Sequence, residues 1–307
     1  MHQNGPMPLL LHAIVDGSAR IAATSKRTEK VAVLADLFGE MSEAEVPIVV
    51  AMLSGEPRQG KIGVGYKAIS QMDVSATEAP AVRVEDVDAS LTEIAGTTGP
   101  GSQAVRRELL SDLLRRCTRR EQDFLKRLLV GGVRQGALEG LMLEAVAKAA
   151  DLPAAAVRRA AMMLADLGRV AVVALADGLV GLSEIRLEVL RPIQPMLAKT
   201  APSAAEAMET EGLSSVEWKL DGVRIQVHRS GEEVKVFTRN LNEVTDRLPD
   251  VAGIVLGFGA TQFVLDGEVM SLAVDGKPRP FVETMSRFGT EGRAEDTDPV
   301  LSLIHIS

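Results

Sequence analysis

The feature that most constrains the fold is a change in the spacing of apolar residues near residue 191. Before it, apolar side chains recur every three or four positions, which is the spacing of one face of an α-helix. After it, apolar and polar side chains alternate, which is the spacing of a half-buried β-strand. Since a chain of 307 residues is long enough for two domains, we expect the two patterns to form two domains of different class.

The first part of the chain predicts a helical domain. Residues 138–150 carry apolar side chains on one helical face, and Pro153 and Gly168 are suited to begin and end the next helix. Residues 55–102 are rich in glycine near both ends and predict a less regular connection. A helix over residues 104–117 is indicated by apolar residues at every fourth position: Val105, Leu109, Leu113 and Cys117.

The later part of the chain predicts a largely antiparallel sheet. Residues 216–220 lead into an Asp-Gly turn, and residues 223–228 then alternate strictly between apolar and polar. Further strands are expected over residues 234–237 and 262–272. Consecutive strands joined by tight turns pair in the antiparallel sense, so we expect a meander of such strands.

Lys219 is the candidate nucleophile of the second domain. It begins the hexapeptide Lys-Leu-Asp-Gly-Val-Arg, whose tight turn can bring Arg224 back near the lysine. A neighbouring guanidinium and a bound metal ion lower the pKa of an amine, and a neutral amine can attack the α-phosphate of a nucleoside triphosphate. The short motif alone is equally compatible with a surface lysine in a hairpin.

Two later segments add groups that nucleotidyl transfer needs. Arg239 and Asn240 follow the next predicted strand, and Asp266 and Glu268 lie inside an apolar strand. A buried strand seldom carries carboxylates without partners, because unpaired buried charge is costly. Together the segments supply a nucleophile, two cations that can face phosphate, and a carboxylate for a ribose or a metal ion.

In this order the motifs resemble those of the covalent nucleotidyltransferases, which comprise DNA ligases, RNA ligases and mRNA capping enzymes. Residues 191–198 and 280–287 are similar to segments of ATP-dependent DNA ligases, and the helical front part resembles the bacterial ligase B type. The resemblance implies a multi-domain protein of α and α+β class. An all-α DNA-binding domain at residues 1–190 would precede an incomplete, largely antiparallel adenylation domain at residues 191–300.

The resemblance also implies roles for individual residues. Lys219 would become adenylated by ATP, and Glu217 would recognise the adenine. Arg224 and Arg239 would hold phosphate and ribose groups, and Glu268 would contact the ribose or Mg²⁺. The implied reaction is the sealing of nicks in duplex DNA through a lysyl-AMP intermediate, in replication, repair and recombination.

Nicked double-stranded DNA is the expected partner of the first domain. Residues 103–136 carry nine cationic and four anionic side chains, and glycines at residues 131–136 let backbone amides approach a phosphate. Contacts to the DNA backbone would be independent of sequence and strongly dependent on salt. A solvated helix face with internal ion pairs is the alternative. The expected contacts are Arg58, Lys61, Arg115, Arg119 and Arg134.

Composition limits the setting of the protein. The net charge of −8 argues against nucleic-acid binding only as an average, because local potential decides it. The single cysteine, Cys117, is expected in a helical core, and its lack of a disulfide partner favours a reducing cytoplasm. No apolar run is long enough for a membrane span. The one cysteine and four scattered histidines do not predict a zinc site. A monomer is expected.

The end of the chain predicts a truncated protein. Residues 301–307 resemble the translation of a sequencing adaptor and are expected not to belong to a ligase. The groups that stack on adenine and grip the α-phosphate, and an OB-type domain, would follow residue 300, so the fragment is expected to be inactive or weak. An RNA ligase or capping-type enzyme and a non-catalytic DNA-binding fragment are the rival interpretations.

Overall fold

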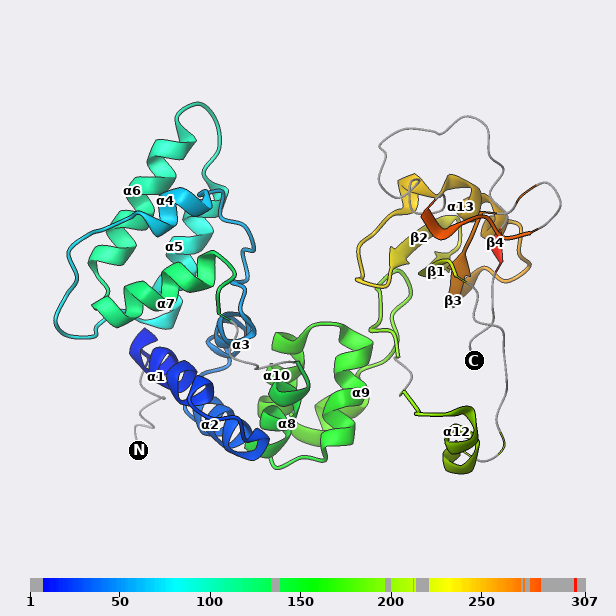
Figure 1. The fold of residues 1–307 in the computed structure, drawn as a ribbon, viewed down its shortest axis with the longest axis horizontal. Helices are drawn as coiled ribbons and strands as arrows, with labels where there is room; N and C mark the ends of the chain where they lie inside the picture. The colour runs from blue at the N-terminus through cyan, green and yellow to red at the C-terminus, as the bar shows by residue number, and fades with distance from the viewer. Residues whose placement is uncertain are drawn as a thin grey trace. The chain divides into compact units, whose positions relative to one another are not determined.

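The protein is described by a computed structural model that covers residues 8–133, 139–196, 200–211, 213, 221–271, 273, 277–282 and 301–302. The chain divides into two compact units, Met1–Ile185 and Arg186–Ser307 (Figure 1). Within the described ranges, none of the helices combines the length and the hydrophobicity that crossing a bilayer requires.

Every named element of the first unit, among its described residues, is an α-helix, and the prediction of an all-α front part is confirmed (Figure 1). One continuous apolar core joins these helices. They are α1 (Leu11–Ala22), α2 (Arg27–Gly39), α3 (Val46–Ser54), α4 (Tyr66–Ser70), α5 (Val84–Gly96), α6 (Ser102–Arg115), α7 (Arg119–Leu129), α8 (Glu139–Ala149), α9 (Ala154–Leu164), α10 (Leu167–Ala176) and α11 (Gly178–Glu184).

The buried face of α6 differs from the predicted one. Val105 is half exposed, whereas Leu110, Leu113, Leu114 and Cys117 are buried. A strict spacing of four residues drifts around a helix that has 3.6 residues per turn. The observed spacing of three and four residues keeps the side chains over the core, and the prediction that Cys117 lies in the core is confirmed.

Two local predictions in the first unit were wrong. Residues 55–102 contain the 13-residue helix α5, whose residues Val84, Val87, Leu91 and Ile94 are buried along one face. Gly168 does not end α9 but lies inside α10, where a Cβ atom would lie 3.0 Å from Cβ of Pro47. That glycine permits α10 to approach α3 closely, which is a packing role that the sequence does not distinguish from a helix stop.

The second unit contains a sheet in which every pair of neighbouring strands is antiparallel, as predicted (Figure 1). The strand order is β2-β1-β3-β4. The predicted strand at residues 216–220 lies outside the described residues. The named elements are α12 (Ala204–Glu211), β1 (Val223–Ser230), β2 (Glu233–Thr238), the 3₁₀-helix η1 (Thr245–Arg247), α13 (Pro249–Leu256), β3 (Gln262–Val269) and β4 (Leu301–Ser302).

One face of the sheet forms the apolar core of this unit. Ile225 and Val227 of β1 and Val236 of β2 are buried with Val251 and Val255 of α13. The short strand β4 pairs Leu301 with Val269 at the end of β3. β4 lies within residues 301–307, the segment that the sequence predicts to be foreign to the protein. That this segment is foreign stays a prediction.

The central strand β1 is covered on both faces, so the expectation of a half-buried strand was wrong. Gln226 is 3% exposed and His228 is 0% exposed, although both are polar. Their face is covered by the chain that precedes the sheet, through hydrogen bonds to Leu190 and Ile193. Arg229, on the other face, donates from Nη1 to the carbonyl oxygens at the end of α13 and just beyond it.

Candidate functional site

An ion pair joins the first and third strands at the centre of the candidate nucleotide site. Arg224 donates from Nε and Nη2 to the two carboxylate oxygens of Asp266, at 2.9 and 2.5 Å. Both side chains are about one quarter exposed. The hydrogen bonds to Asp266 raise the pKa of Arg224 against the opposing effect of its burial, so the guanidinium remains charged. The pair supplies the partner that a carboxylate inside an apolar strand requires.

Arg224 also anchors the chain that precedes the sheet. Its Nη1 donates to the carbonyl oxygen of Met196 at 2.9 Å. A guanidinium has five N–H groups, and these contacts use three of them. The remaining N–H groups can face an anion while the side chain stays fixed in direction.

Glu268 fixes the backbone just after the candidate nucleophile. Its Oε1 accepts the N–H of Gly222 at 3.0 Å. A Cβ atom on Gly222 would lie 2.5 Å from the carbonyl oxygen of Val269, so only glycine permits this approach to the end of β3. The turn that follows Lys219 is therefore held against β3.

The sequence-predicted site residues are brought together in part. Arg224, Asp266 and Glu268 share one face at the end of β1 and β3, with Arg224 directly opposite Glu268 in the register. Arg239 is exposed immediately after β2, which is an edge strand. Lys219 and Glu217 lie outside the described residues.

The sequence interpretation did not identify Gln226 and His228 as residues of interest. Gln226 exchanges two hydrogen bonds with the backbone of Ile193, at 3.1 and 2.5 Å. His228 accepts the N–H of Leu190 at its Nδ1, 3.1 Å away, and its ring meets the ring of Phe237 edge-on. Burial lowers the pKa of His228 to about 4, so the ring is neutral at physiological pH. The alternation of polar residues along β1 was the available indication, but it was interpreted as solvent exposure.

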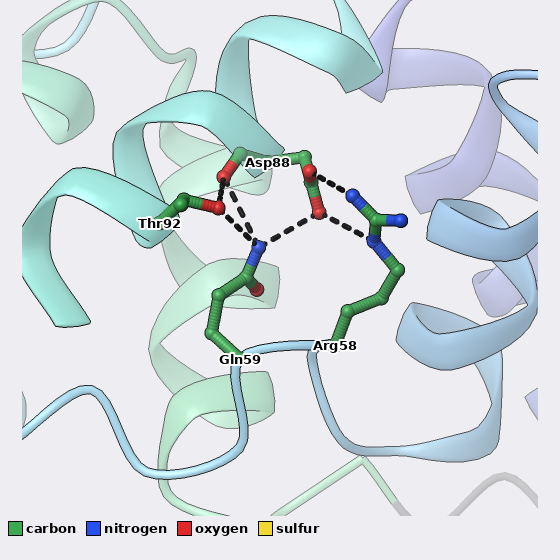
Figure 2. A network of polar contacts seen from close by, with 4 residues as sticks. All are labelled: Arg58, Gln59, Asp88 and Thr92. Carbon is green, nitrogen blue, oxygen red and sulfur yellow. Dashed lines mark hydrogen bonds and ion pairs between the residues drawn. The ribbon is translucent and has the colours of Figure 1, made fainter. Parts of the chain in front are cut away.

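The candidate nucleic-acid surface of the first unit has a different character from the predicted one. Arg58 forms two hydrogen bonds with the carboxylate of Asp88, which Gln59 also contacts while it donates to Thr92 (Figure 2). The charge of Arg58 is therefore offset by a carboxylate that is only 12% exposed. This network fastens the loop after α3 to α5.

Two other predicted phosphate contacts are also in ion pairs. Arg115 contacts Asp112 and Glu108 of its own helix, and Arg119 contacts Asp73 at 3.0 Å. The Arg115 pairs are those of a solvated helix face, which was the alternative interpretation. Lys61 is exposed, with no ion pair to the residues described here, and Arg134 lies outside them.

Arg106 is one of the nine cations of residues 103–136, and the sequence interpretation did not name it as a phosphate contact. It donates to the carbonyl oxygens of Thr97 and Gly63, at 2.6 and 3.4 Å, rather than to a carboxylate. Gln103 donates to the same Gly63 oxygen, so the loop around Gly63 is fastened to α6. Arg107 is exposed beside Arg106, and Lys61 is exposed on the fastened loop. None of these three cations is in an ion pair with a residue whose position the structure describes.

Comparison with known proteins gives two matching family models. The model described as "ATP dependent DNA ligase domain" matches residues 195–303. The model described as "DNA ligase N terminus" matches residues 66–147. The first match includes the site around Arg224, and the second includes α4 to α7.

Curated relatives match along most of this chain. A "Probable DNA ligase" of Rhodococcus jostii (strain RHA1) is 49% identical over 284 residues, which are 92% of this chain and 56% of that protein. A "Probable DNA ligase" of Anaeromyxobacter sp. (strain Fw109-5) is 47% identical over 281 residues, 91% of this chain and 54% of that protein. The chain thus spans about half the length of the curated relatives it matches.

A solved structure supports the fold. The structure titled "Pmar-Lig_PreS3" has a TM-score of 0.53 and 16% sequence identity, and the match covers 94% of this chain and 56% of that chain. At this identity the likeness concerns the fold alone. The two family models and the relatives show that residues 66–147 and 195–303 belong to domains of the ATP-dependent DNA ligase family.

Proposed function

We propose that this chain is the front part of an enzyme that seals nicks in duplex DNA at the expense of ATP. Lys219 attacks the α-phosphorus of ATP, so that a P–N bond forms and pyrophosphate leaves. The AMP group then moves to the 5′-phosphate at the nick, and the lysine is released. The 3′-hydroxyl finally displaces AMP and closes the phosphodiester bond, in replication, repair and recombination.

The observation that carries this proposal is the arrangement around Gly222. Glu268 holds the N–H of Gly222, and Arg224 is locked to Asp266 in the same layer. Both contacts fix the chain within a few residues of Lys219. A nucleophile that must meet one phosphorus atom in line benefits from such fixation, because orientation supplies much of the rate of intramolecular reactions.

The remaining roles in the site follow from this arrangement. Glu217 contacts the adenine, and Arg224 and Arg239 hold phosphate and ribose groups. Mg²⁺ would neutralise the phosphates. Glu268 fits a contact to the metal ion or the ribose because the Gly222 hydrogen bond uses Oε1 alone, whereas Arg224 engages both oxygens of Asp266. Among the described residues, no group of three His, Cys, Asp or Glu side chains forms a metal site by itself.

The first unit binds nicked duplex DNA by contacts to the phosphates of the DNA backbone. Lys61, Arg106 and Arg107 are the best supported contacts because no carboxylate offsets their charge among the residues with described positions. Arg134, in the glycine-rich segment, is a further contact. Arg58, Arg115 and Arg119 contribute less, since each is already in an ion pair.

The setting and extent of the enzyme complete the proposal. The enzyme acts as a monomer in the cytoplasm, which suits its buried, unpaired Cys117. The DNA-binding domain comprises residues 1–190 and the first part of the adenylation domain residues 191–300, with residues 301–307 foreign to it.

A chimera tests the proposal. Residues 1–300 replace the matched region of the Rhodococcus jostii relative, and the product is incubated with Mg²⁺, nicked DNA and labelled ATP or GTP. We expect ATP-dependent sealing that is lost in Lys219→Ala. Labelling by GTP, or sealing of RNA but not DNA, would favour a capping enzyme or RNA ligase. Sealing that persists in Lys219→Ala would contradict the proposal.

A further inference from the structure

The segment 190–196, here called the strap, crosses the polar face of β1 and is fastened to it at three points. His228 accepts the N–H of Leu190, Gln226 pairs with both backbone groups of Ile193, and Arg224 donates to the carbonyl of Met196. The contacting residues are two apart along β1 and three apart along the strap, and their order along the strap is reversed. The strap therefore runs antiparallel to β1 with its Met196 end at the candidate site.

The central contact is the one of the three that consists of two hydrogen bonds. Gln226 is 3% exposed, and its side-chain amide both donates to and accepts from Ile193. Such a two-way pair fixes the position of the strap along the strand. His228 supports it, because a ring that accepts at Nδ1 carries its proton on Nε2, 3.4 Å from Oε1 of Gln226.

The strap also has a constrained backbone. Leu190 has a φ of +72°, in the left-handed region that is unfavourable for a side chain with a Cβ atom. The hydrogen bond from its N–H to the buried His228 holds it there. Residues in such conformations persist when the surrounding contacts determine them.

We propose that Gln226 is a positioning residue for the nucleotide site. Gln226 holds Ile193, the strap delivers the Met196 carbonyl, and that carbonyl together with Asp266 sets the direction of the Arg224 guanidinium. The N–H groups of Arg224 that remain then face the phosphate or ribose of ATP. This inference rests on the proposed function, since it assumes that ATP binds beside Arg224.

The test combines amide exchange with ATP affinity in the 307-residue chain. Gln226→Met keeps the length of the side chain and removes both hydrogen bonds. We expect the Ile193 amide to exchange about tenfold faster and the Kd for Mg-ATP to rise about tenfold, because two neutral hydrogen bonds are lost. Gln226→Glu keeps the acceptor for the Ile193 N–H and loses the donor, so its Kd should be intermediate and should improve as the pH falls and the carboxyl group takes up a proton.

A control separates positioning from stability. Val251→Ala removes buried side-chain volume from α13 in the same unit and touches none of the strap contacts. We expect it to lower the melting temperature and to leave the Kd for ATP unchanged. If both Gln226 variants bind ATP as the unsubstituted chain does, the inference is overturned and the strap is purely structural.

The remaining outcomes separate this inference from the proposed function. If the Ile193 amide exchanges at the same rate in Gln226→Met, the inference is overturned. The proposed site still stands in that case, provided that the unsubstituted chain binds ATP. An unsubstituted chain that binds no ATP would overturn both the site and the inference.

Discussion

Arg224 and Asp266 are joined by two parallel hydrogen bonds between adjacent strands, and the pairing is diagonal in the register. Arg224 lies directly opposite Glu268, while Asp266 lies opposite Gln226. The diagonal leaves Glu268 to hold Gly222. The two carboxylates of β3 thus bind different groups: Asp266 binds the Arg224 side chain, and Glu268 binds the backbone N–H of Gly222.

Asp266→Ala should destabilise the second unit by about 2 kcal/mol, because a half-buried guanidinium loses its charged partner. Urea denaturation monitored by the fluorescence of Trp218 or by circular dichroism measures the change. Asp250→Ala, at an exposed position in α13, is the matched control and should change stability little. Equal stability of the Asp266 and Asp250 variants would show that the ion pair contributes nothing.

Gly222→Ala should lower both stability and adenylation. The added Cβ atom would lie 2.5 Å from the Val269 carbonyl oxygen, so the turn after Lys219 must move away from β3. The expected loss of stability is about 1–3 kcal/mol. Gly253→Ala in α13 is the control, because its Cβ atom meets nothing within 4 Å. That helical substitution should stabilise by up to about 1 kcal/mol, and a similar response of both variants would contradict the account of Gly222.

Acidification should weaken the second unit through His228. Burial lowers the pKa of this ring from 6.5 to about 4, so the unfolded chain binds a proton that the folded chain does not bind between these values. The contribution is fully present above pH 6.5, decreases as the pH falls, and levels off below about pH 4 after a loss of about 3 kcal/mol. Urea midpoints across this range measure it. The stability of His228→Gln should depend less on pH, and identical pH profiles would exclude this role for the ring.

DNA affinity should depend on Lys61 and Arg107 more than on Arg119. Each phosphate contact contributes about 0.9 to the slope of log K against log salt. Lys61→Ala and Arg107→Ala should each reduce the slope by about that amount, as measured by fluorescence anisotropy with a nicked duplex. The double variant Arg119→Met, Asp73→Asn removes an existing ion pair and should leave the slope unchanged. The reverse order of effects would place the DNA contact at Arg119 rather than at Lys61 and Arg107.

The fold class was predictable because each pattern of apolar residues corresponds to one kind of element. The change from helical spacing to alternation near residue 191 indicates helices followed by a sheet, and the structure has that order. Details that depend on distant segments were not predictable. The polar residues of β1 are buried because residues 190–196 cover them. Gly168 lies within α10, where the absence of a Cβ atom permits the close approach of Pro47.

The candidate site could be predicted in its residues but not in its pairings. The motifs identify Arg224, Asp266 and Glu268, but the register decides that Arg224 pairs with Asp266 rather than with the opposing Glu268. The charge of Arg119 was visible in the sequence, whereas its partner Asp73 is 46 residues away and is found only in the folded structure. The roles of Lys219, Glu217, Arg224, Arg239 and Glu268 in binding the nucleotide remain predictions.

The most direct test of the central claim locates the AMP group. The chimera is incubated with ATP and Mg²⁺ without DNA, and its peptides are sequenced by mass spectrometry under alkaline conditions that preserve a phosphoramidate. We predict one adenylated residue, Lys219, and no adenylate in Lys219→Ala. AMP on another residue, or an adenylated Lys219→Ala protein that still seals nicks, would contradict the account.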